Sequence, residues 1–104
     1  MNTVALQDLK ARLLNSFTYI EKMILFGSVA RNESDNESDC DLLILTNQPL
    51  NRFERHKITN TIFDVNLLHD TNYSSIVIDK NAWESGPVSV LPIKNEVQRD
   101  GIDI

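Results

Sequence analysis

The chain contains few of the residues that build disulfide frameworks and zinc sites. Its 104 residues include one cysteine, Cys40, and two histidines, His56 and His69, which lie well apart in the sequence. A single thiol cannot form an internal disulfide, and these three residues lack the clustered spacing of zinc ligands. The sequence therefore argues against a disulfide-stapled fold and against a zinc site.

Long apolar runs are also missing. No segment approaches the roughly 20 apolar residues that a membrane-spanning helix requires. The amino terminus lacks the basic stretch, apolar core and small-residue cleavage site of a secretory signal. We therefore expect no membrane partner and a cytoplasmic location. A chain of 104 residues gives room for one domain, over residues 1–104, and none for a second substrate-binding domain.

Positive charge is scarce as well. Ten Lys and Arg residues stand against fifteen Asp and Glu, which gives a net charge of -5. The one close basic group, Arg52, Arg55 and Lys57, is typical of a solvated helix face. Because nucleic-acid backbones are bound chiefly by clustered cations, the sequence disfavours a polynucleotide partner. A single nucleotide remains compatible with this charge.

The apolar residues that are present predict an α/β fold, with a small mixed β-sheet and helices packed against it. Helical spacing of Leu6, Leu9 and Leu13 indicates a first helix. The other elements follow from apolar runs and from turn residues. The expected elements are a helix at 4–14, strands at 23–26 and 40–45, a helix at 51–60, a strand at 61–68, a short helix at 73–78, a helix at 87–99 and an extended tail at 102–104.

Two neighbouring features indicate a metal-nucleotide site. Gly27 and Ser28 follow an apolar strand, and Ser28 is suited to cap a short helix whose free amides would face an anion. After a ten-residue polar spacer, Asp39 and Asp41 stand two residues apart at the start of the next strand. The period of two puts both carboxylates on one face and Cys40 on the other. Paired carboxylates are ligands that Mg²⁺ prefers.

Each of these residues also has a plain structural explanation. Gly27 and Ser28 would serve equally as a turn with a helix cap, and Asp39 and Asp41 as the solvated end of an acidic loop. Asp64 interrupts the apolar strand expected at 61–68, where an edge strand can expose a carboxylate to water. An EF-hand calcium loop fails, because the central Gly and the final Glu are missing at the required positions.

Taken together, these motifs resemble the minimal nucleotidyltransferases (MNT) of the polymerase-beta-like nucleotidyltransferase superfamily. The family pattern is a Gly-Ser pair, a spacer of about ten residues, and Asp-x-Asp between apolar strands. Here it is matched by Gly27-Ser28 and Asp39-Cys40-Asp41. The resemblance covers about residues 3–68 and the closing segment 93–102. Asn32 departs from it, since relatives usually carry Gly there, although Asn tolerates a left-handed backbone.

The resemblance implies a polymerase-beta-like fold and transfer of a nucleoside monophosphate, expected to be AMP, from ATP or another NTP to an acceptor hydroxyl. In the family pattern Gly27, Ser28 and Arg31 would bind the nucleotide phosphates. Asp39, Asp41 and Asp64 would be the catalytic residues and would hold Mg²⁺, with two ions expected. Asp64 would also help to deprotonate the attacking hydroxyl.

The same resemblance suggests a partner. Many bacterial relatives act with a small helical protein of the HEPN class as a toxin-antitoxin pair, in which the nucleotidyltransferase is the antitoxin. A partner hydroxyl is then the expected acceptor, and an oligomer is compatible with this arrangement. Two alternatives stay open: a binding module that neutralises its partner by masking, with weak catalysis, and a transferase that modifies a small molecule.

Overall fold

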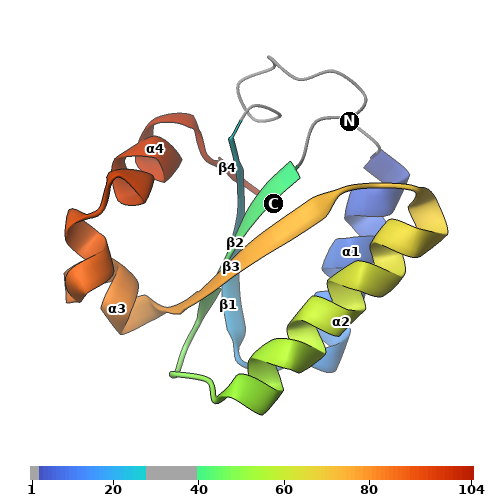
Figure 1. The fold of residues 1–104 in the computed structure, drawn as a ribbon, viewed down its shortest axis with the longest axis horizontal. Coiled ribbons are helices and arrows are strands. Elements are labelled where there is room, and N and C mark those ends of the chain that lie inside the picture. Colours follow the sequence, from blue (N-terminus) through green and yellow to red (C-terminus); the bar gives the residue numbers. More distant parts are fainter. Residues whose placement is uncertain (1–2, 28–39) are drawn as a thin grey trace.

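The computed structural model describes residues 3–27 and 40–104. Within these residues, a mixed sheet has the strand order β3-β2-β1-β4 (Figure 1). Strand β1 (Ile20–Phe26) pairs antiparallel with β2 (Cys40–Thr46) and with the short β4 (Ile102–Asp103). Strand β3 (Tyr73–Asp79) runs parallel to β2 on the other side. The expected small mixed sheet with packed helices is confirmed.

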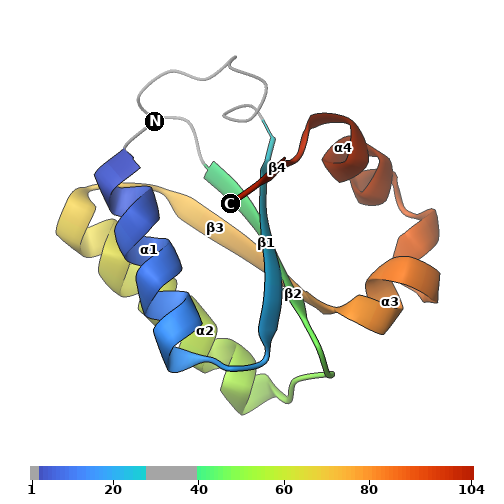
Figure 2. The same ribbon diagram turned by 180° about the vertical axis from the view of Figure 1, so that it is seen from behind.

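Helices α1 (Thr3–Ser16) and α2 (Arg52–His69) cover one face of the sheet (Figures 1 and 2). Their buried side chains share a core with side chains from β1, β2 and β3. Helical spacing explains the α1 contribution, because Ala5, Leu9 and Leu13 lie on one side of that helix and are fully buried. The strand residues in this core include Met23, Leu42, Ile44 and Tyr73.

Helix α3 (Lys80–Ser85), a 3-10 turn (Pro87–Val90) and helix α4 (Pro92–Asp100) cover the opposite face (Figure 1). The second core joins alternate strand residues to Trp83 and Val97 of these helices, and the strand residues are Ile24, Phe26, Leu43 and Leu45. The alternation of Leu42 and Leu43 between the two cores confirms the period of two predicted for β2. It also fixes Cys40 on the α1/α2 side, where it packs against the first core.

The strand predicted at 61–68 is wrong. Helix α2 begins after Asn51, whose side chain accepts a hydrogen bond from the Glu54 N–H at 2.8 Å, and it continues to His69. Its buried residues Ile58, Ile62 and Val65 recur at helical spacing. The segment resembled a strand because several apolar residues on its other side are exposed, among them Phe63, Leu67 and Leu68.

The two segments that follow also differ from expectation. The helix predicted at 73–78 is strand β3, whose Ile76-Val77-Ile78 run has the β-branched residues that suit a sheet. The helix predicted at 87–99 is split at Leu91, which is extended because the residue before a proline avoids helical backbone. The extended tail is confirmed as β4. Among the described residues, no helix is long and apolar enough to cross a membrane.

Candidate functional site

Asp41 lies at the start of β2 and is flanked by a residue of each neighbouring strand. Its Cα partner is Phe26 on β1 and Ser74 on β3. The Ser74 hydroxyl donates a hydrogen bond to Asp41 Oδ1 at 3.0 Å. Asp41 has the parity of Leu43, so it stands on the α3/α4 face, and it is partly exposed. Its carboxylate is thus held by the sheet yet open to a ligand.

Gly27 lies directly against this carboxylate. It follows β1, is buried, and has a φ of 85°, a backbone conformation that favours glycine. A Cβ at this position would lie only 2.5 Å from Asp41 Oδ2. The Gly turn predicted from the sequence therefore meets the carboxylate of the next strand, and only glycine fits without displacing it.

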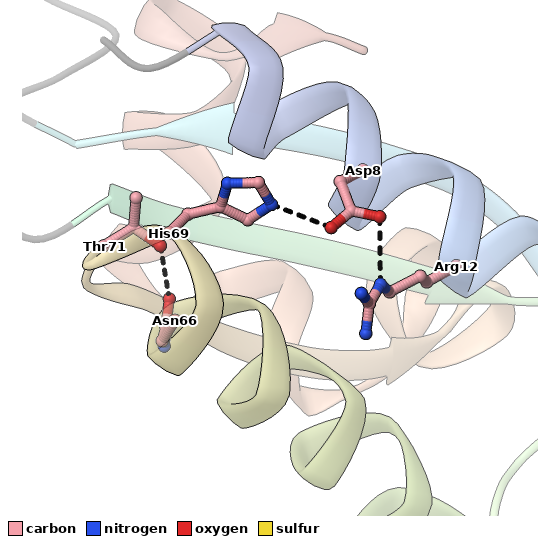
Figure 3. A network of polar contacts seen from close by, with 5 residues as sticks. All are labelled: Asp8, Arg12, Asn66, His69 and Thr71. Carbon is pink, nitrogen blue, oxygen red and sulfur yellow. Dashed lines mark hydrogen bonds and ion pairs between the residues drawn. The ribbon is translucent and has the colours of Figure 1, made fainter.

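A half-buried hydrogen-bonding side chain, Asn66, fixes the start of β3 beside the site. Asn66 Oδ1 accepts from the Thr71 hydroxyl at 3.0 Å (Figure 3). It also accepts from the Tyr73 N–H at 2.9 Å, while Asn66 Nδ2 donates to the Tyr73 carbonyl at 3.0 Å. Tyr73 itself is buried, and desolvation raises the pKa of its hydroxyl to about 12. The Cys40 N–H donates to the Asn72 carbonyl at 3.0 Å. These bonds set the register that places Ser74 opposite Asp41.

A second polar network joins α1 to α2. Asp8 accepts hydrogen bonds from Arg12 Nε at 2.9 Å and from His69 Nε2 at 2.8 Å (Figure 3). The hydrogen bond from His69 has the largest effect and the hydrogen bond from Arg12 the next largest, and both lower the pKa of the Asp8 carboxyl below its usual 3.8. Arg12 lies one turn from Asp8 on α1, and His69 lies at the end of α2, so the network holds these two helices together. We assign it to stability.

The predicted site residues fall into three groups. Gly27 and Asp41 are brought together as expected. Ser28, Arg31 and Asp39 lie outside the described residues. Asp64 was expected on a strand, but it stands on an exposed face of α2. The strand placement is therefore wrong, and it was the reason for assigning Asp64 to the metal. Its catalytic role stays a prediction without that support.

Ser74 is the site residue that the sequence prediction missed. The segment around it was expected to be helical, which would not have placed it beside Asp41. The β-branched run Ile76-Val77-Ile78 is the signal that indicates a strand here, although it does not reveal that Ser74 pairs with Asp41.

The donor set can be tested against Mg²⁺. Asp41 offers a partly exposed carboxylate in a cradle that a Cβ at Gly27 would fill, which suits a small hard cation. In residues 3–27 and 40–104 there is no group of three or more His, Cys, Asp or Glu side chains that would hold a metal. The described residues thus fit a cation at Asp41, but they supply only part of its ligands.

Comparison with known proteins identifies the family of the chain. The family model for the polymerase beta nucleotidyltransferase domain matches residues 8–88. A curated relative from Methanocaldococcus jannaschii, assigned provisionally as a protein adenylyltransferase, is 32% identical over 85 residues, which are 82% of this chain and 79% of that protein. The chain therefore belongs to the polymerase beta nucleotidyltransferase family, and its predicted class, a nucleotidyltransferase, is confirmed.

Solved structures support the fold at lower identity. A toxin-antitoxin crystal structure with AMP-PNP contains a chain that is 17% identical, with a TM-score of 0.65, matched over 99% of this chain and 72% of that one. The complex of a tri-AMPylated Shewanella oneidensis HEPN toxin with an MNT antitoxin contains a chain that is 16% identical, with a TM-score of 0.61. The match covers 99% of this chain and 71% of that one. A provisionally assigned nucleotidyltransferase from Sulfolobus solfataricus is 21% identical, with a TM-score of 0.59. The match covers 95% of this chain and 75% of that one.

Proposed function

We propose that this protein transfers the nucleoside monophosphate of an NTP, expected to be AMP from ATP, to a hydroxyl of a partner protein. The observation that carries the proposal is the contact between Gly27 and the Asp41 carboxylate. It joins a turn of the kind that approaches phosphates to an oxygen ligand of the kind that binds Mg²⁺. Family membership supplies the reaction class.

In the proposed site, Gly27 and Ser28 bind the outer phosphates through backbone and hydroxyl donors, and Arg31 contacts the triphosphate. Asp39 and Asp41 hold Mg²⁺, which when bound neutralises phosphate charge and orients the triphosphate. The acceptor oxygen bonds to the α-phosphorus while the bond from the α-phosphorus to the oxygen that bridges to the β-phosphate breaks. Pyrophosphate leaves, and the acceptor hydroxyl gives its proton to water. Asp64 is left out, since it lies on an exposed helix face.

Two comparisons favour a protein acceptor. The Methanocaldococcus jannaschii relative is described as acting on protein, and one structural neighbour is a complex with an AMPylated HEPN toxin. We extend both to this chain as a proposal: its acceptor is a helical HEPN-type toxin, and the chain is the antitoxin.

Helix α2 offers a surface for such a partner. Phe63 and Leu67, one turn apart, are 59% and 68% exposed, and Leu68 beside them is 64% exposed. Apolar side chains gathered on one helix face are costly in water and commonly mark a protein contact. We call Phe63, Leu67 and Leu68 the α2 apolar face.

The masking module remains the second candidate, because Ser74 rather than a carboxylate lies beside Asp41 on β3. Both candidates can be tested in one experiment. Source-cell extract and Mg²⁺ are mixed with α-labelled or γ-labelled ATP and with either the wild type or the Asp39→Asn, Asp41→Asn double variant. Label from the α position alone, lost in the variant, supports transfer. A stable partner complex without label from any α-labelled NTP supports masking.

A further inference from the structure

The two oxygens of the Asp41 carboxylate have different neighbours. Oδ1 accepts the hydrogen bond of the Ser74 hydroxyl at 3.0 Å. Oδ2 is the atom that a Cβ on Gly27 would meet at 2.5 Å. The hydrogen bond at Oδ1 restrains rotation of the carboxylate, and Oδ2 then lies on the side of the Gly27 turn.

No acidic residue pairs with Asp41 across the described sheet. Its strand partners are Phe26 and Ser74. The acidic residue of β3 is Asp79, which pairs with Thr46 at the other end of β2 and caps α3 by accepting from the Ala82 N–H at 3.1 Å. The strand position that would bring a further carboxylate to Asp41 is therefore filled by a neutral hydroxyl.

We propose that Ser74 is a positioning residue for the metal-binding carboxylate of Asp41, and that position 74 borders the cation. This inference rests on the proposed function. With a hydroxyl at this place, β3 adds no charged ligand beside Asp41, and the nucleotide phosphates must supply others. Cation binding should consequently be weak for the protein alone and should tighten when nucleotide is bound.

Binding of Mn²⁺, measured by electron paramagnetic resonance with a non-hydrolysable ATP analogue present, tests this inference. Ser74→Ala removes the hydrogen bond, and Ser74→Thr keeps a hydroxyl on a residue that suits a strand. Ser75→Ala is the matched control, because Ser75 is the next residue on the opposite face of β3. Thermal unfolding of each variant separates a loss of fold from a loss of cation.

The expected result is that Ser74→Ala weakens Mn²⁺ binding about fivefold, the value of one net hydrogen bond. Ser74→Thr should restore the affinity and Ser75→Ala should leave it unchanged, with all unfolding temperatures close to the wild type. Wild-type affinity in Ser74→Ala would overturn the inference. Asp41→Asn separates a failure of the role inferred for Ser74 from a failure of the proposed function. If Asp41→Asn also binds Mn²⁺ with wild-type affinity, the proposed metal site itself is wrong.

A gain of affinity gives a sharper test, since damage to the fold cannot produce it. Ser74→Asp places a carboxylate beside Asp41, and we expect at least about tenfold tighter Mn²⁺ binding without nucleotide, because carboxylates dominate the binding of such cations. Unchanged or weaker binding in a folded Ser74→Asp variant would show that position 74 does not border the cation.

Discussion

Gly27 and Asp41 Oδ2 are so close that any side chain at residue 27 would collide with the carboxylate, since a Cβ would lie 2.5 Å from that oxygen. The backbone adds a second cost, because φ at Gly27 is 85°. Gly27→Ala should therefore lower the free energy of unfolding by about 1–2 kcal/mol from the backbone alone, and it should abolish nucleotidyl transfer by displacing Asp41. Urea unfolding and label transfer measure the two effects.

A double-mutant cycle isolates the contact from the backbone strain. Asp41→Ala removes the carboxylate that the new methyl group meets, so the double variant should lose less stability than the sum of the two single variants. Strict additivity would show that Gly27 and Asp41 do not meet in solution.

The three hydrogen bonds of Asn66 hold α2 to the start of β3. Asn66→Ala should lower the free energy of unfolding by about 2 kcal/mol, since it leaves polar groups of the buried Tyr73 segment without partners. Asn60→Ala, on the exposed face of the same helix, is the matched control and should change stability by less than about 0.5 kcal/mol. Equal effects of the two substitutions would contradict the role of Asn66.

The Asp8 network predicts a response to acid. Because the hydrogen bonds from His69 and Arg12 lower the pKa of Asp8 in the folded state, its contribution to stability is present above about pH 4 and is lost as the pH falls through the folded pKa. Asp8→Asn should thus have a lower unfolding temperature than the wild type at pH 6, and the gap should narrow towards pH 3. Asn60→Ala, which changes an exposed uncharged side chain of α2, is the control and should show no such convergence.

The α2 apolar face predicts how a partner is bound. Replacing Phe63 and Leu67 together by Ser should weaken binding of the HEPN-type partner at least about tenfold, because exposed apolar anchors carry much of the energy of an interface. Val90→Ser is the control, since Val90 is 84% exposed but belongs to the α3/α4 layer. Calorimetric titration compares the two variants. Greater damage from Val90→Ser would place the partner on the other side.

The sequence predicted the fold class and the meeting of Gly27 with Asp41, but it misassigned residues 61–79. Gly27 and Asp41 stand at the ends of two strongly apolar strands, so their proximity followed from local pattern and from the family motif. Residues 61–79 were misassigned because their signals conflict. Helix α2 exposes apolar residues on the side away from the core, which mimics a buried strand, and β3 begins with Tyr73, Ser74 and Ser75, which have no strong apolar alternation. The segment is helical because a helix buries Ile58, Ile62 and Val65 against the sheet.

The position of Ser74 could not be predicted without the sheet register. It depends on the parallel pairing of β3 with β2, and that pairing joins residues far apart in the sequence. Asn66 sets it from within α2, through bonds to a segment seven residues later. Contacts of this kind produce no periodic pattern in the sequence. Asp64 was therefore assigned as the third metal-binding carboxylate.

The most direct test of the account is mass spectrometry of a purified HEPN-type partner after incubation with this protein, ATP and Mg²⁺. We predict a mass gain of one or more adenylyl groups on a hydroxyl-bearing side chain, absent with the Asp39→Asn, Asp41→Asn double variant. An unmodified partner, bound as tightly by the double variant as by the wild type, would contradict transfer and identify the protein as a masking module.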